Sequence, residues 1–141
     1  MECRYIDEEN YRKRMISLCV RSVLPGLPKK RIDRAVLLKS LIQRFRSDVE
    51  YGEKEVNLII ATWLDEVTPK MKSDFVTLRR LLVDEGVLQR DAQGSSYQLK
   101  TSDLRDFEFS EKINPREIES ELGNVREDIL RRRREFLDES T

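Results

Sequence analysis

The clearest structural signal in the chain is the stretch DFVTLRRLLVDEGVLQR at residues 74–90. Its apolar side chains recur at helical spacing, which places them on one face of a helix: Phe75, Leu78, Leu81 and Leu82. Ser73 or Asp74 can cap the start of this helix with a side-chain oxygen. Gly86 stands where helices commonly end in a left-handed residue. The stretch therefore predicts a short amphipathic helix that ends near Glu85.

A β-hairpin is expected directly after this helix. Residues 87–90 (VLQR) and 96–99 (SYQL) have the composition of short strands, and the residues between them contain the glycine of a turn. Before the helix, apolar residues three and four apart predict two further helices, over about 30–46 and 53–64. A turn is expected at 47–52. Three helices followed by a hairpin is the element order of a winged helix-turn-helix.

A helix is also expected near the N-terminus. Asp7 can cap its start, and the PGLP sequence at residues 25–28 stops it. Its apolar face is expected to carry Tyr11, Met15, Leu18, Cys19, Ser22 and Val23. Cys19 lies in an apolar run, so its thiol is expected to be buried and unreactive.

The C-terminal part of the chain predicts one long helix. Asn114 and Pro115 form a favourable helix start, and helix-compatible residues continue to about Leu137. Before it, residues 101–110 are expected to form a polar connection whose two phenylalanines contact the core. Apolar residues at heptad-like spacing form a seam along the helix: Ile118, Leu122, Val125, Ile129 and Phe136. This seam is expected to pack against its own domain, a second copy or another protein.

The expected fold class is mainly α with a small β-hairpin, a winged helix-turn-helix core with extra N- and C-terminal helices. Residues 1–26 would hold the N-terminal helix and residues 27–99 the winged-helix-like domain. Residues 100–141 would form an acidic connection and the C-terminal helix.

Composition excludes several classes of function. The 141 residues contain no histidine, so a histidine-based catalytic relay or a histidine-ligated zinc site is excluded. Two cysteines cannot form a four-thiolate zinc site, and the five glycines are too scattered for a phosphate-binding loop. We therefore expect no enzyme activity, no metal and no cofactor. Without a long apolar run, the protein is expected to be cytoplasmic and to make no membrane contact.

Charge is unevenly distributed although the net charge is zero. Residues 1–49 hold 12 basic and 6 acidic groups, whereas residues 101–141 hold 8 and 12. This asymmetry indicates either a polyanionic partner or neutralisation by the acidic tail of the same chain or of a second copy. The candidate basic patch consists of Arg12, Lys13, Arg14, Lys29, Lys30 and Arg31. The run Arg131–Arg134 wraps a whole helical turn and is expected to be a solvated helix end.

Three blocks of sequence occur in a characteristic order: Pro28–Arg31, Tyr51–Asn57 and Asp74–Arg90, followed by Gly94 and Tyr97. With these blocks, the stretch from Leu27 to Tyr97 resembles the uncharacterised bacterial family called domain of unknown function 2087. The resemblance implies a regulator-like winged helix and no particular reaction. Two departures touch the expected DNA-reading region: Glu85 stands where the family more often has an aromatic residue, and the loop at 65–72 is longer.

The predicted helix near residues 75–85 would present Thr77, Arg80 and Asp84 on the face opposite its apolar stripe. An arginine there can contact guanine or a phosphate. The candidate DNA-binding residues are Lys70, Lys72, Ser73, Thr77, Arg79, Arg80, Arg90, Gln93 and Ser95. Of these, Lys70, Lys72 and Ser73 would hold phosphates together with the free helix amides. Against this role, Asp84 can pair with Arg80, and one of the two arginines can be used in an intrachain salt bridge.

Two functional hypotheses remain open. In the first, the protein is a regulator of transcription that binds double-stranded DNA as a dimer, with the C-terminal helix supplying the dimer seam. In the second, the winged helix is a protein-interaction module or adaptor that docks partners without binding DNA.

Overall fold

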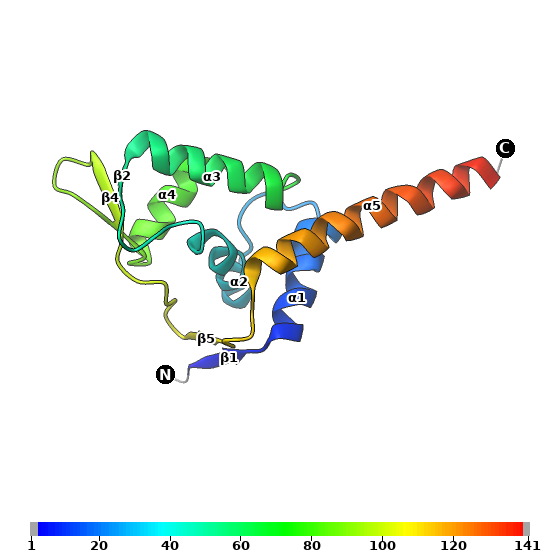
Figure 1. Cartoon of the computed structure of the whole chain (residues 1–141), viewed down its shortest axis with the longest axis horizontal. Coiled ribbons are helices and arrows are strands. Elements are labelled where there is room, and N and C mark those ends of the chain that lie inside the picture. The colour runs from blue at the N-terminus through cyan, green and yellow to red at the C-terminus, as the bar shows by residue number, and fades with distance from the viewer. Residues whose placement is uncertain (1–2, 140–141) are drawn as a thin grey trace.

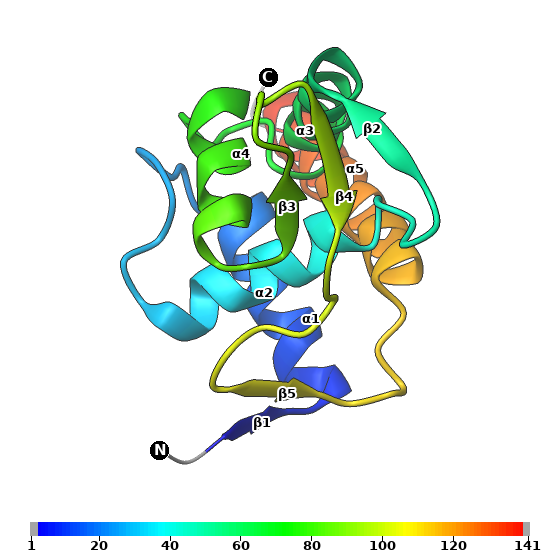
Figure 2. The ribbon, with the colours of Figure 1, turned by 90° about the vertical axis from the view of Figure 1, so that its left-hand side faces the viewer.

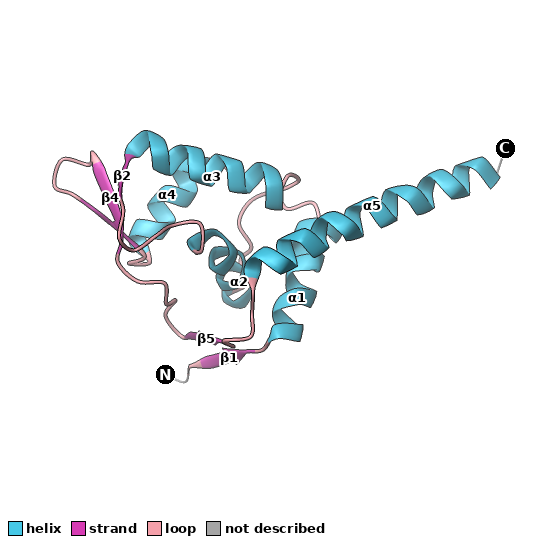
Figure 3. Ribbon diagram, in the orientation of Figure 1, coloured by secondary structure: helices cyan, strands magenta, loops and turns pink. Residues whose placement is uncertain are grey.

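The computed structural model describes residues 3–139. It is mainly helical, with an antiparallel sheet of three short strands and a second pair of strands (Figures 1 and 3). The elements are β1 (Arg4–Ile6), α1 (Glu8–Ile16), the π-helical turn η1 (Ser17–Arg21), α2 (Arg31–Ile42), β2 (Glu50–Gly52), α3 (Glu53–Val67), α4 (Phe75–Asp84), β3 (Leu88–Arg90), β4 (Ser96–Leu99), β5 (Phe107–Phe109) and α5 (Pro115–Glu139). The expectation of a mainly helical chain with a β-hairpin is thus confirmed. Nowhere in residues 3–139 is there a helix with the length and apolar character needed to span a membrane.

Helices α2, α3 and α4 supply a large share of the apolar side chains that form the core of the molecule. Trp63 of α3 is fully buried, and its indole N–H donates to the hydroxyl oxygen of Ser40 on α2 at 3.0 Å. On α4, Leu78 and Leu82 are completely buried. Phe75, which was expected to point inward, is 36% exposed. That prediction is wrong because α4 enters the core only from Leu78 onward.

The β-hairpin is present, and a third strand joins it. Strands β3 and β4 are antiparallel, and β2 pairs with the other edge of β4, so the sheet order is β2-β4-β3. Strand β2 replaces part of the turn expected at 47–52. Its Tyr51 lies opposite Tyr97, and its hydroxyl accepts a hydrogen bond from the backbone N–H of Arg46 at 2.8 Å. The Tyr51 ring meets Phe45 edge-on, which buries Phe45 although α2 has already ended at Ile42.

The N-terminal helix begins as expected and ends differently. The Asp7 carboxylate accepts a hydrogen bond from the backbone N–H of Asn10 at 2.7 Å. After Ile16 the chain widens into the π-helical turn η1. Because a π-helix has more residues per turn, it shifts the later side chains around the axis, and Val20 becomes buried. Val23 was expected on the buried face and is 67% exposed, beyond the end of η1.

The segment before α5 contains a strand that the sequence did not reveal. Strand β5 pairs in parallel with β1 (Figure 2). Part of the segment at 101–110, which was expected to be an irregular polar connection, is therefore hydrogen-bonded to residues near the N-terminus. Phe107 and Phe109 pack against the core, as expected. The ring of Phe109 meets Tyr11 edge-on at 6.2 Å between centroids.

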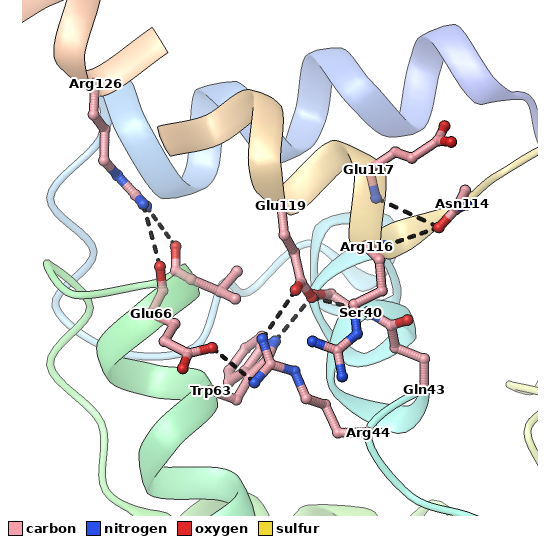
Figure 4. A network of polar contacts seen from close by, with 11 residues as sticks. Ser40, Gln43, Arg44, Trp63, Glu66, Asn114, Arg116, Glu117, Glu119 and Arg126 are labelled. Carbon is pink, nitrogen blue, oxygen red and sulfur yellow. Dashed lines mark hydrogen bonds and ion pairs between the residues drawn. The ribbon is translucent and has the colours of Figure 1, made fainter. Parts of the chain in front are cut away.

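The first half of α5 docks on the domain through a polar network (Figure 4). The Glu119 carboxylate accepts hydrogen bonds from Ser40, Gln43 and Arg44, each at 2.9 Å. Further along, Arg126 donates to the carbonyl oxygens of Cys19 and Val67 at 3.1 and 2.6 Å. These contacts join α5 to α2, η1 and the end of α3.

The predicted seam on α5 is divided between two environments. Ile118 and Leu122 are buried within their own chain, and Val125 and Ile129 pack partly against its core. Ile118 and Leu122 are therefore covered by their own chain, whereas Val125 and Ile129 stay partly exposed. Phe136, three residues before the end of α5, is 69% exposed. The C-terminal end of this helix projects away from the body of the molecule (Figure 1).

Candidate nucleic-acid interface

Helix α4 presents the outward face that its sequence predicts. Thr77, Arg80 and Asp84 are all exposed. Gly86 adopts a φ of 78°, the left-handed conformation that ends the helix and leads into β3. Helix α5 makes its main contacts with α1, η1 and α2 and projects toward the opposite end of the molecule (Figure 1). The outward face of α4 is therefore open to solvent.

The two neighbouring arginines of α4 have different environments. Arg79 donates to the side-chain oxygen of Asn57 and forms an ion pair with Glu53 at 3.1 Å, so it ties α4 to α3. Its side chain is 15% exposed. Arg80 is exposed, and within residues 3–139 it has no ion pair, including with Asp84. Of the two, only Arg80 is available to an external ligand.

The N-terminus of α4 is already capped from within the chain. The Asp74 carboxylate accepts a hydrogen bond from the backbone N–H of Thr77 at 2.8 Å, which lowers the pKa of this carboxyl. The Asp74 carboxylate thus engages the Thr77 amide, so a phosphate at this helix start would have to compete with it. Lys70 and Lys72 remain exposed beside it, with Ser73 partly exposed.

A loop from the N-terminal side lies next to these lysines. The backbone N–H of Lys72 donates to the carbonyl oxygen of Leu24 at 2.9 Å. A Cβ added at Gly26 would lie 3.7 Å from the Lys72 carbonyl oxygen, an ordinary contact distance. This proximity joins segments far apart in the chain, so no local pattern in the sequence could indicate it.

The hairpin offers fewer ligand contacts than its sequence suggests. Ser95 donates its backbone N–H and its hydroxyl to the Asp91 carboxylate, at 2.8 and 3.0 Å. These hydrogen bonds hold the turn and lower the pKa of Asp91. Ser95 is thus engaged within the hairpin, whereas Arg90 and Gln93 are exposed.

The basic patch splits into a neutralised part and an open part. Arg12 pairs with Glu8 and Glu121 at 3.0 and 2.8 Å. Lys13 pairs with Glu9, and Arg14 pairs with Asp33. The chain thus neutralises its first basic cluster itself, and Glu121 belongs to the acidic C-terminal region.

The second basic cluster lies at the start of α2. Arg31 pairs with Asp106. Lys29 and Lys30 are exposed and have no ion-pair partner in the portion of the chain that the structure covers, residues 3–139. At the other end of the chain, Arg131 and Arg132 share Asp128 on α5, and the whole run 131–134 is exposed, as expected of a solvated helix end.

A family model described as an uncharacterized protein conserved in bacteria (DUF2087) matches residues 23–99. The matched residues run from the loop before α2 to the end of β4, and they contain every candidate DNA-binding residue of α4 and the hairpin. No curated protein and no solved structure matches the chain.

Proposed function

The chain belongs to the family of uncharacterized bacterial proteins DUF2087, and we propose that the region from α2 to β4 is a winged helix-turn-helix that binds double-stranded DNA. The protein would then be a non-enzymatic regulator of transcription. The order α2, β2, α3, α4, β3, β4 and the sheet order β2-β4-β3 support this proposal. In this arrangement, α4 follows α3 as the recognition helix and the β3–β4 hairpin is the wing.

The observation that carries the proposal is the exposed outward face of α4. Arg80 has the length and the planar donor group to contact guanine or a phosphate, and Thr77 can contact a phosphate or a thymine methyl group. The intrachain contacts of Arg79 hold the helix against α3 without using this face. A rigid helix with one exposed arginine suits the major groove; within residues 3–139 Arg80 forms no ion pair, and its charge attracts the nearby Asp74 carboxylate.

The surrounding charges favour binding that is strongly salt dependent. Lys70, Lys72 and Arg90 flank the helix and are exposed, so they can contact the phosphates on either side of the groove. Asp74 and Asp84 oppose this attraction. Contacts of this kind release counterions, so affinity should fall steeply with added salt.

Fluorescence anisotropy of a labelled mixed-sequence duplex, titrated with the protein at several salt concentrations, tests the proposal. The logarithm of the affinity should fall linearly with the logarithm of the salt concentration, with a slope of several units. Arg80→Ala should weaken binding about tenfold, the loss of one strong contact. Arg116→Ala, which removes an exposed arginine from α5, is the matched control and should leave binding unchanged. Absent or salt-insensitive binding would contradict the proposal.

The proposed regulator is a dimer joined through the projecting half of α5. Leu130, Phe136 and Leu137 are 52%, 69% and 62% exposed there, and apolar side chains gathered on an extended helix favour a helical partner. Two copies would present two α4 helices to two half-sites on DNA. Light scattering should give the mass of a dimer. If the protein were strictly monomeric at high concentration, the proposed dimer would be contradicted, and the proposal of duplex binding would be unaffected.

A second candidate function is a protein-interaction module. The carboxylates of Asp74 and Asp84 on the α4 face favour it, because they repel phosphates, whereas together with Arg80 they present both signs of charge to a protein surface of mixed charge. Failure of the protein to bind random or cognate duplex in the anisotropy experiment would select this alternative.

A further inference from the structure

A basic groove lies away from the outward face of α4, where the β1–β5 pair meets the start of α2. Its volume is about 530 Å³, and its walls come from four separate segments of the chain. The polar lining residues are Arg4, Arg14, Lys30, Arg31 and Asp106. Ile32 and Phe107 supply its apolar wall. Because Arg4, Arg14 and Asp106 lie outside residues 23–99, the groove depends on the segments that flank the family region.

Two of the cations in the groove are fixed by neighbouring carboxylates. Arg14 forms an ion pair with Asp33 at 2.7 Å, and Arg31 forms one with Asp106. The other two, Arg4 and Lys30, have no ion pair anywhere in the described part of the chain, residues 3–139. Two cations are thus held in place and two are available to a ligand.

The start of α2 adds to the positive potential. Lys30 is the N-cap residue of this helix, and no side chain accepts a hydrogen bond there. Basic residues at a helix start are unfavourable, because the first backbone amides already carry partial positive charge. A bound anion would offset both the uncapped amides and the lysine. Asp33 in the first turn is directed to Arg14 instead.

Shape and lining indicate a small ligand. Ligand pockets in proteins typically enclose ~300–1,000 Å³, and this groove falls within that range. A neighbouring cleft, lined also by Arg34, Arg105 and Glu85, shares Arg31 and Phe107 with this groove, so two further arginines and one carboxylate lie along one edge. A convex duplex would not fill such a concave space, whereas a compact anion with a flat apolar portion against Phe107 would.

We propose that this groove binds a phosphorylated small molecule. Arginine and lysine side chains that converge from several segments, together with open helix amides, form the donor set that phosphate groups prefer. A ligand with a single carboxylate would be bound by only one of these arginines and would leave the other donors unused. Lys30 and Arg4 are the residues assigned to the phosphate, and Phe107 to the apolar portion. The proposal does not depend on DNA binding by α4.

Isothermal titration calorimetry on the full chain at low salt tests the site, with pyrophosphate, ADP, adenosine and citrate as probes. Pyrophosphate and ADP should bind, and adenosine and citrate should bind at least about tenfold more weakly. Lys30→Gln and Arg4→Gln should each weaken ADP binding about tenfold, the loss of one charged hydrogen bond. Neither change removes an intrachain ion pair, so the fold should be kept. Lys29→Gln, at the exposed neighbour outside the groove, is the matched control and should bind ADP normally.

Four results would overturn the proposal. Absence of pyrophosphate and ADP binding at millimolar concentration removes the site. If Lys29→Gln and Lys30→Gln weakened ADP binding equally, ADP would be attracted to a basic surface in general and not to this groove. If citrate bound as tightly as pyrophosphate, the groove would have no preference for phosphate. In the fourth result, a DNA duplex competes with ADP, and its binding is weakened by Lys30→Gln and unaffected by Arg80→Ala. The groove would then bind the DNA backbone and not a small molecule.

Discussion

Helices α1 and α4 differ in how their charges are used. Helix α1 carries three consecutive basic residues, and each is paired with a carboxylate of the same chain. Residues 70–86 carry four basic and three acidic groups, yet Arg80 and both lysines of this stretch are exposed and have no ion pair within residues 3–139. A dense run of basic residues is therefore a poor guide to a binding surface. Whether carboxylates lie next to those residues, in the same helix or brought there by the fold, matters more.

The largest effect is expected where paired charges are most buried. The side chains of Glu119 and Arg44 are 11% and 9% exposed, and Glu119→Ala would leave Arg44 without one of its two carboxylate partners in a mostly buried position. We expect a loss of about 3 kcal/mol in the free energy of unfolding, measured by urea denaturation. Glu117→Ala, at an exposed residue in the same part of α5, should change stability by less than about 0.5 kcal/mol. Equal effects would contradict a structural role for the network.

The next experiment compares the two basic regions directly in duplex binding. The double variant Lys70→Ala/Lys72→Ala should lower the slope of log affinity against log salt by about 2, since each phosphate contact contributes about 1. Arg12→Ala/Lys13→Ala removes as many positive charges from α1 and should leave the slope unchanged, because those residues already face carboxylates. Equal slopes for the two double variants would show that only total charge matters.

A smaller effect is expected from the carboxylate at the start of α4. Asn caps a helix as well as Asp does, so Asp74→Asn should keep the helix and remove one negative charge from the proposed interface. Duplex affinity at low salt should rise a few-fold, measured by anisotropy. Unchanged or weaker binding would separate Asp74 from the interface.

The same variant has a consequence for acid stability. The pKa of Asp74 is lowered in the folded chain by its hydrogen bond from Thr77. Its contribution is therefore present above the pKa of the unfolded chain and is lost as the pH falls through the lowered folded value. Thermal melts should show a weaker loss of stability in that acid range for Asp74→Asn than for the wild type.

The smallest effect concerns the two cysteines. Burial raises the pKa of the Cys19 thiol to about 12, whereas Cys3 is exposed. A thiol reagent at neutral pH should modify Cys3 alone in the folded chain and both cysteines after denaturation. Since unfolded Cys19 ionises near pH 9.0, its contribution to stability is complete below that pH and is lost between about pH 9.0 and 12. Rapid modification of Cys19 in the folded chain would show that η1 opens.

Local patterns predicted most elements of the family region. The helices around Trp63 and Leu78 follow from apolar spacing, and the hairpin follows from its turn. Strands β1, β2 and β5 have three residues each and were missed. Strand β3 is equally short, but a turn joins it to its partner β4 and makes the pair recognisable. Strands β1, β2 and β5 pair only with distant parts of the chain, so no local pattern indicates them.

The candidate sites show the same division. The exposure of Thr77 and Arg80 could be predicted, because their position relative to the apolar stripe of α4 depends only on helix geometry. The intrachain contacts of Arg79 and Ser95 could not be predicted, because they depend on how α3 and α4 pack and on how the hairpin turn closes. The basic groove could not be predicted from the sequence either, because Arg4 and Asp106 lie beside the start of α2 only when β1 pairs with β5.

The sequence by itself determined where three of the helices begin and where α4 ends. Asp7, Asp74 and Asn114 each cap a helix start, and Gly86 ends α4 in a left-handed conformation. These are interactions within a few residues, so local chemistry is sufficient. Only the tertiary structure decided which charges distant in the chain neutralise one another: Arg12 and Glu121 are 109 positions apart. Ion pairing depends on distances in space, and those are set only when the core packs.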